Sequence, residues 1–82
     1  MTPQEKAKDL IYKIAAKYNN TTYEGAKESD KYVNIMFAPD SEFWRECALI
    51  AIDEILKANA VWHINSIPHK YWTNVKNEIQ KL

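Results

Sequence analysis

The segment from Arg45 to Leu56 is too apolar to form an ordinary surface helix. The run from Cys47 to Ile52 has no polar break, and two more apolar residues follow at positions 55 and 56. At about 100° per residue, a helix gathers these side chains into two neighbouring stripes, and a surface helix needs only one. We therefore expect this helix to be covered on two sides at the centre of the fold. The first stripe comprises Trp44, Cys47, Ala48, Ala51 and Ile55, and the second comprises Leu49, Ile52 and Leu56.

The length and composition are typical of one small domain, which we place at residues 1–82. One glycine and three prolines favour long uninterrupted elements over an all-β fold with many tight turns. Eleven basic residues balance eleven acidic residues, and zero net charge gives no general attraction to nucleic acid or to an anionic membrane. The single cysteine, Cys47, excludes an internal disulfide, and its apolar neighbours favour a buried thiol.

A first helix is predicted over residues 3–18. Thr2 is a good N-cap, the proline after it suits the first helical position, and Glu5 completes a capping box. Asp9 and Lys13, four residues apart, are expected to pair on the solvent side. The apolar residues that recur at helical spacing on one face are Ala7, Leu10, Ile11, Ile14 and Tyr18.

Residues 19–40 are harder to interpret. Gly25 is expected to supply a turn with an unusual backbone angle. An apolar cluster near Pro39 fits both strand alternation and a helical turn, and it is too short for periodicity to decide. We favour a short helix that covers the central one, because a single strand has no evident partner. The cluster comprises Tyr32, Val33, Ile35, Met36 and Phe37.

The central helix is predicted to begin after Pro39, with a polar N-cap at residue 40 or 41, and to run to about residue 59. Asp53 and Lys57 are spaced to pair on its solvent side. Residues 60–67 are predicted to form a loop or an extended segment that still carries apolar side chains able to pack on the core. This connection leads to a third helix.

The third helix is predicted to begin near Pro68 and to present one narrow apolar stripe. Together the three helices predict an all-α fold, a small three-helix bundle in which the outer two sandwich the wide-faced central one. If they cover only its first stripe, then Leu49, Ile52 and Leu56 stay open for another copy or another protein. The narrow stripe comprises Tyr71, Trp72, Val75, Ile79 and Leu82.

No arrangement of residues is typical of a catalytic, cofactor or metal site. His63 and His69 are separated by a proline and have no cysteine nearby, which disfavours a metal site. A chain with one glycine cannot form a glycine-rich phosphate loop. Adjacent carboxylates such as Asp53 and Glu54 project about 100° apart on a helix, which is poor for shared acid and base catalysis. We therefore expect a binding module that is not an enzyme and has no cofactor.

Aromatic residues in the connecting segments are the candidates for partner binding. Tyr23, Tyr32, Phe37 and Trp62 fall there, and residues in connections are often exposed and functional. Aromatic side chains anchor protein interfaces and also stack on nucleotides. Without a basic patch beside them, protein binding is favoured over nucleic-acid binding. Packing in the core is the simpler interpretation for each ring taken alone.

Three segments, taken in order, resemble a set of short helical proteins encoded by phages and prophages of Bacteroidota. These segments are Met1–Leu10 (MTPQEKAKDL), Glu46–Ile55 (ECALIAIDEI) and Tyr71–Leu82 (YWTNVKNEIQKL). The resemblance covers about half of the chain and includes part of each predicted helix. Most such proteins have no assigned activity, so the resemblance implies origin more than mechanism, and specific function would sit in the connecting segments.

Small phage proteins without catalytic activity often occupy host machinery, so the leading hypothesis is a phage protein that antagonises a bacterial defence complex, in particular an anti-CRISPR inhibitor of an RNA-guided, RNA-cutting nuclease. The alternative is an oligomer, paired through the Leu49, Ile52 and Leu56 stripe, that sequesters a nucleotide immune signal. DNA binding is disfavoured by the neutral charge and by a third helix that is polar but not basic. No signal peptide or membrane span is recognisable, so we expect a cytoplasmic protein.

Overall fold

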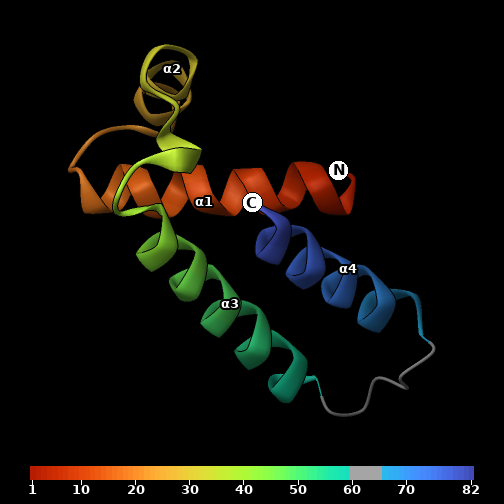
Figure 1. Cartoon of the computed structure of the whole chain (residues 1–82). Coiled ribbons are helices and arrows are strands. Elements are labelled where there is room, and N and C mark those ends of the chain that lie inside the picture. The colour runs from red at the N-terminus through yellow and green to blue at the C-terminus, as the bar shows by residue number, and fades with distance from the viewer. Residues whose placement is uncertain (60–65) are drawn as a thin grey trace.

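The computed structural model describes residues 1–59 and 66–82, and in these residues the chain forms helices and no strand (Figure 1). The prediction of an all-α chain is confirmed, but the described chain has four α-helices where the sequence indicated three and a short irregular or helical segment between the first two. The elements in order are α1 (Pro3–Tyr18), α2 (Tyr23–Val33), the short 3-10 helix η1 (Ile35–Phe37), α3 (Ser41–Ala58) and α4 (Ile67–Lys81).

Helix α1 begins and ends where the sequence predicts. The Thr2 hydroxyl accepts a hydrogen bond from the Glu5 N–H at 3.2 Å, and the Glu5 carboxylate accepts one from the Thr2 N–H at 3.1 Å. This reciprocal capping box satisfies two backbone donors that the first turn would otherwise leave without partners. The face that α1 buries completely consists of Ala7, Ile11 and Ala15.

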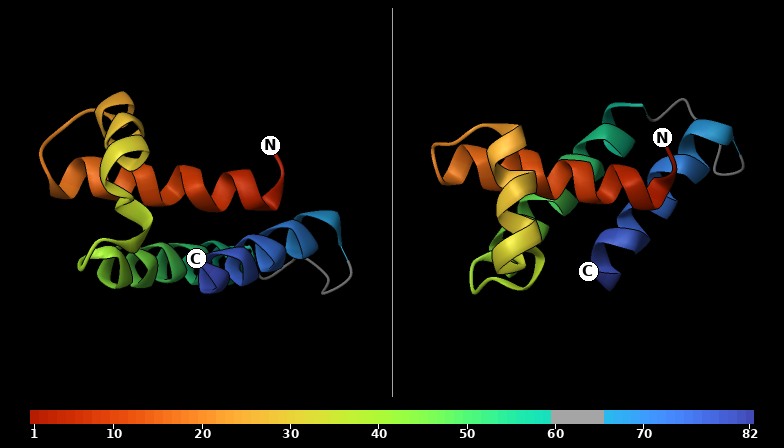
Figure 2. Two further views of the ribbon diagram at one scale, coloured as in Figure 1. Left: turned by 45° about the horizontal axis from the view of Figure 1, so that its top comes forward. Right: turned by 90° about the horizontal axis from the view of Figure 1, so that it is seen from above.

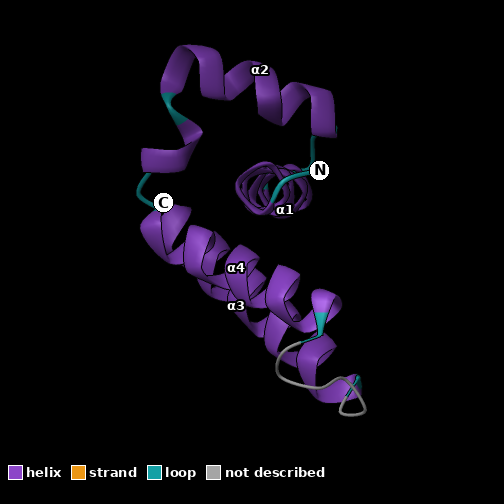
Figure 3. Ribbon diagram, turned by 90° about the vertical axis from the view of Figure 1, so that its right-hand side faces the viewer, coloured by secondary structure: helices purple, strands orange, loops and turns teal. Residues whose placement is uncertain are grey.

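Helix α1 is the element that contacts all three other helices. Helices α3 and α4 lie side by side in one layer, and α1 lies across one face of that layer. Helix α2 lies across α1 on the side of α1 that faces away from α3 and α4 (Figures 2 and 3). The sequence assigned the central place to the helix after Pro39, and that assignment is wrong. Width of apolar surface is a poor guide here, because the small side chains of Ala7, Ala15 and Ala16 let neighbouring helices approach α1 closely.

Helix α2 was not predicted from its sequence as an element of its own. Gly25 was expected in a turn, but it lies in the first turn of this helix, and its N–H donates to the N-cap Thr22 hydroxyl at 3.0 Å. A Cβ on Gly25 would lie 2.6 Å from the Thr21 Oγ1, so close approach explains the glycine. The left-handed backbone positions belong instead to Asn20 and Asn34, with φ of 52° and 51°.

The apolar cluster before Pro39 is split between two elements. Helix α2 ends with Val33 in its last turn, and η1 follows after Asn34. Ile35 and Met36 are buried, at 5% and 7% exposure, and η1 contacts both α2 and α3. The preference for helix over strand is therefore confirmed, although the helix begins much earlier in the chain than the cluster.

Helix α3 has the predicted bounds but is covered on one side. Its buried apolar residues recur every four positions, and Trp44 and Ala48 belong to the first stripe inferred from the sequence whereas Ile52 belongs to the second. Ala51 is exposed and Ile50 is 63% exposed, so the expectation of a helix covered on two sides is wrong. Both α1 and α4 contact α3, and η1 adds to them near its N-terminus.

Helix α4 packs through the predicted stripe and is joined to α3 by an ion pair. Val75 and Ile79 are fully buried, and Tyr71, Trp72 and Leu82 pack against the core. The Lys76 Nζ lies 3.0 Å from the Asp53 Oδ1, so Asp53 pairs across helices. The predicted pair of Asp53 with Lys57 is therefore not formed, and Lys57 instead lies 3.7 Å from Glu54.

Candidate functional site

A half-open cavity of about 370 Å³ lies where the end of α1, α2, η1 and the start of α3 meet. These four segments gather at one end of the molecule in Figure 1, where the colour passes from orange through yellow to green. The wall mixes apolar side chains with hydroxyl, amide and carboxylate groups. Its lining residues are Asn19, Thr21, Ala26, Ser29, Val33, Ile35, Ala38, Asp40 and Trp44.

Trp44 is the unusual residue in this wall. Its side chain is 2% exposed, and among the described residues its indole Nε1–H has no hydrogen-bond acceptor. Buried side-chain donors in native proteins are nearly always paired, and an unpaired one costs about 1–3 kcal/mol. The sequence placed Trp44 in the core, which is correct, but gave no sign that its polar atom would lack a partner.

Two exposed aromatic rings connect Trp44 to the protein surface. The Tyr18 ring lies 5.9 Å from the Trp44 ring at 67°, and 5.9 Å from the Phe43 ring at 54°. Tyr18 and Phe43 are each 54% exposed. The edge-on geometry is the one that the electrostatics of aromatic rings favours. A buried donor and two accessible rings therefore form one aromatic cluster.

The segments that frame the cavity also carry most of the exposed large hydrophobic side chains of the described chain. Eight such side chains are exposed, and five of them belong to α1, α2, η1 or the start of α3. Tyr32, Val33 and Phe37 are the most exposed of these five, at 80%, 67% and 77%. We call the five residues the junction surface: Tyr18, Tyr32, Val33, Phe37 and Phe43.

Tyr23, a predicted partner-binding residue, braces α2 on α1. Its ring is half-buried, contacts the Tyr12 ring edge-on at 6.2 Å, and has the ammonium groups of Lys27 and Lys13 within 5.3 and 5.9 Å of its centroid. The hydrogen bond from its hydroxyl to Asp9 raises the pKa of Tyr23 to about 12, with burial adding to the effect. These contacts direct Tyr23 toward the rest of the chain.

Asp9 lies beneath these contacts and is buried, at 6% exposure, contrary to its predicted place on the solvent side. The predicted pair with Lys13 is formed at 3.0 Å, and Lys6 lies 3.4 Å from the same oxygen. Burial raises the pKa of Asp9, but hydrogen bonds from Tyr23 and Lys13 and the Lys13 charge outweigh it and leave the pKa lowered. The carboxylate is therefore ionised and structural.

Asp30 holds α2 and η1 in position against α1. Its Oδ2 accepts a hydrogen bond from the Tyr12 hydroxyl at 2.7 Å, and its Oδ1 accepts one from the Met36 N–H at 3.2 Å. Burial, followed by the hydrogen bond and the charge of Asp30, raises the pKa of Tyr12 to about 12. This carboxylate therefore joins three elements and sets where the junction surface lies.

The three predicted partner-binding residues of α3 are turned toward the core. Ile52 is fully buried, and Leu49 and Leu56 are half-buried and pack against the core. The stripe expected to stay open is thus covered within the chain, since α1 and α4 approach α3 from that side. The exposed apolar residue of α3 that sequence reasoning did not select is Ile50.

The remaining predicted site residue, Trp62, lies outside the described residues. Tyr32 lies in the last turn of α2 and Phe37 on η1, and both are exposed. The sequence could have indicated Phe43 as well, because its angle on the helix lies outside both predicted stripes.

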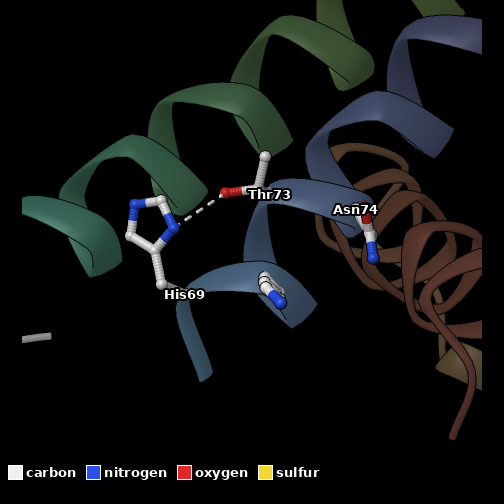
Figure 4. A pocket seen from close by; sticks show the side chains of 4 residues that line it. His69, Thr73 and Asn74 are labelled. Carbon is white, nitrogen blue, oxygen red and sulfur yellow. Dashed lines mark hydrogen bonds between the residues drawn. The ribbon is translucent and has the colours of Figure 1, made fainter. Parts of the chain in front are cut away.

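Two further hollows in the described part of the chain are smaller than this cavity. One of about 300 Å³ lies on α4 beside His69, whose Nδ1 is 3.5 Å from the Thr73 hydroxyl one turn away (Figure 4). The other, of about 250 Å³, lies between α3 and α4 near Arg45 and Gln80. Within residues 1–59 and 66–82, no three His, Cys, Asp or Glu side chains gather in a way that could hold a metal ion.

Comparisons with protein families, with curated proteins and with solved structures find no match to this chain. No helix in the described part of the chain has the length and apolar character that crossing a bilayer requires.

Proposed function

We propose that this chain is a small docking protein that acts by binding a partner protein, without catalysis, through the junction surface. The observation that carries the proposal is the exposure of Tyr32, Val33 and Phe37 beside a cavity with an unpaired buried donor. Aromatic anchors of this kind supply most of the binding energy in protein interfaces. An 82-residue chain has few apolar side chains to spare from its core, so leaving these outside calls for a reason.

The proposed partner is a bacterial defence protein or ribonucleoprotein in the cytoplasm of the host cell. This part of the proposal rests on the resemblance of the three helical segments to phage and prophage proteins of Bacteroidota. Within that class, an anti-CRISPR inhibitor of an RNA-guided, RNA-cutting effector is the specific hypothesis. Such an inhibitor needs only to occupy a surface of the effector, which is compatible with a chain that docks.

Size-exclusion chromatography of the purified protein with candidate effector complexes tests the proposal. Wild-type protein is expected to co-elute with one complex, and replacement of both Tyr32 and Phe37 by Ala should weaken binding by at least about 30-fold, as for interface hot spots. Ile67→Ala is the matched control, because Ile67 is 84% exposed on α4, away from the junction surface. Equal binding by the double variant and the control would refute docking through this surface.

The oligomeric nucleotide sponge is the second candidate, and it now needs a different pairing surface. Ile52 is buried, whereas Ile50 and the exposed Ala51 lie on the outward side of α3 and could meet the same residues of another copy. Light scattering separates the two candidates. A strict monomer eliminates the sponge, whereas a dimer that Ile50→Glu dissociates would favour it.

A further inference from the structure

We infer that the cavity at the junction is a binding site for an alkyl cation, an ammonium or guanidinium group carried on a short aliphatic chain. Asp40 supplies the opposite charge, and the apolar part of the wall receives the chain. Where a lysine or arginine of the partner is the ligand, the inference rests on the proposed function, whereas a free amine binds without it.

The polar groups around the cavity favour a cation over an anion. Asp40 is the only charged residue among the described residues that line it. Asn19, Thr21 and Ser29 are the other polar residues of the wall, and their amide and hydroxyl oxygens accept hydrogen bonds. Ammonium and guanidinium groups carry only donors, so they match these acceptors. A phosphate or carboxylate ligand would instead meet a like charge.

Asp40 has no charged partner among the described residues. It occupies the N-cap position of α3, but its side chain makes no capping hydrogen bond. It is exposed and takes part in none of the ion pairs of the described chain. Arg45, the basic residue that follows on α3, donates to the Ser41 hydroxyl at 3.2 Å. The helix N-terminus carries only about half an elementary positive charge, so a net negative charge remains for a ligand.

The rest of the wall is apolar and suits a chain of methylene groups. Val33 and Ile35 contribute branched aliphatic side chains, and Ile35 is buried at 5% exposure. A methylene group that is removed from water tightens binding by up to about fourfold. A volume of about 370 Å³ lies within the ordinary range of ligand sites. The apolar wall residues are Ala26, Val33, Ile35, Ala38 and Trp44.

Val33 places the cavity beside the proposed docking surface. It lines the cavity and is also 67% exposed as a member of the junction surface. A partner that covers Val33 therefore lies next to the cavity. Lysine and arginine side chains combine an aliphatic stem with a charged end that stays near water, which is the chemistry that this half-open cavity fits.

NMR titration of isotope-labelled protein at neutral pH tests the inference with three ligands that share a butyl chain. n-Butylammonium has a positive end, n-butanol a neutral end and pentanoate a negative end. n-Butylammonium should shift the amide signals of lining residues such as Ser29 and Val33 and saturate with a Kd of about 1–10 mM. n-Butanol should bind about two- to fivefold more weakly, and pentanoate should not saturate. Equal binding of the three ligands, or shifts spread over the whole chain, would overturn the inference.

Asp40→Asn tests the role of the carboxylate. Asparagine keeps the shape of the side chain and is also a good N-cap, so the fold should be kept. The variant should bind n-butylammonium about two- to fivefold more weakly, which is the range for an exposed ion pair. Glu42→Gln is the matched control, because it removes the same charge from a nearby exposed position of α3 that does not line the cavity. An equal loss of affinity in both variants would refute Asp40 as the specific counter-charge.

Ser29→Leu tests the location of the site. Ser29 is exposed on α2, and a larger side chain at this lining position reduces the space for a ligand without entering the core. The saturable shifts should be lost in this variant and kept in Asn77→Leu, a matched change at an exposed position of α4. If both variants bind n-butylammonium equally, the cavity is not the binding site and the inference fails.

Two further ligands separate the sources of the cation. Nα-acetyl-lysine methylamide presents a lysine side chain on a peptide backbone, and cadaverine is a free diamine. Binding of the lysine derivative at least as tight as that of n-butylammonium supports a side chain of the partner. Tighter binding of cadaverine with no binding of the lysine derivative supports a free amine.

The proposed function and the cation site fail under different results. If a defence complex co-elutes with the wild type and n-butylammonium does not bind, docking stands and the inference fails. If n-butylammonium binds as expected and every complex fails to co-elute, the proposed function fails and the cation site stands.

Discussion

Replacing Asp30 with Ala should destabilise the fold more than any other single change at an accessible charged residue. The change removes the acceptor for the Tyr12 hydroxyl at 2.7 Å and for the Met36 N–H at 3.2 Å. A hydrogen bond to a charged group contributes about 1.5–3 kcal/mol, and the buried Met36 N–H would lose its partner. Because Asp30 is only half-buried and the two bonds are coupled, we expect a loss of about 2–4 kcal/mol.

That loss is large for a chain of this size. Domains are stable by about 0.05–0.15 kcal/mol per residue, which gives roughly 4–12 kcal/mol for this protein. At about 4–8 °C per kcal/mol, thermal unfolding followed by circular dichroism should show Tm lowered by roughly 8–32 °C. Tyr12→Phe removes one of the two hydrogen bonds and should cost about half as much.

Glu28→Ala is the control for Asp30. Glu28 lies on the same helix, and its 3.5 Å ion pair with Lys31 joins side chains that are both more than half exposed. Surface pairs of this kind contribute little, so we expect a change under about 0.5 kcal/mol. If Asp30→Ala lowered Tm no more than Glu28→Ala does, the assignment of Asp30 as the joint between α1, α2 and η1 would be wrong.

Three further predictions concern residues outside the junction surface. Gly25→Ala should destabilise the otherwise wild-type protein, because the new Cβ would lie 2.6 Å from the Thr21 Oγ1. In a Thr21→Ala background the same change should instead stabilise the protein by about 0.5–1 kcal/mol, because alanine favours the helix more than glycine does. Urea unfolding measures both effects. Between pH 10 and 12 the folded chain keeps the Tyr12 proton that the unfolded chain releases, so stability should fall with rising pH, and less steeply in Tyr12→Phe. Lys76→Met breaks the 3.0 Å pair with Asp53 and should cost under about 1 kcal/mol, with the difference shrinking in high salt.

Local signals in the sequence were sufficient to place three of the helices. Thr2 with Glu5, and the apolar spacing of Val75 and Ile79, act within one or two turns, so they can be interpreted without the tertiary structure. Helix α2 carries no such apolar spacing, and Ala26 is its single fully buried residue among those of Tyr23–Val33. Long-range contacts of Asp30 with the Tyr12 hydroxyl and of the Tyr23 ring with Tyr12 and Lys13 hold this helix on α1, and the sequence does not reveal them.

The helix at the centre of the fold could not be predicted from the widths of the apolar stripes alone. A wide apolar stripe on α3 indicated a central place, but the structure covers one side of α3 and leaves Ile50 outside. Helix α1 has the narrower stripe and still contacts every other helix, because Ala7 and Ala15 occupy little volume. Close approach depends on small side chains as well as on apolar ones.

For the candidate site, the sequence predicted which aromatic residues are involved better than it predicted what surrounds each of them. Tyr32 and Phe37 were selected as aromatic residues in a connection, and both side chains are exposed. Tyr23 was selected by the same reasoning and is held by Asp9 and two lysines. The missing acceptor of Trp44 depends on which atoms surround the indole, and that is a property of the tertiary structure.

The way α2 is attached should couple the stability of this chain to the position of the proposed docking surface. Helix α2 contributes few buried apolar side chains, so polar contacts of Tyr12 and Asp30 carry much of its attachment to α1. Tyr32 and Val33 lie on this helix, and Phe37 follows on η1, which Asp30 also holds through the Met36 N–H. Weakening this joint should therefore loosen the junction surface before the α1, α3 and α4 core unfolds. Hydrogen exchange that was equally slow in α2 and in the core of an Asp30 variant would contradict this coupling.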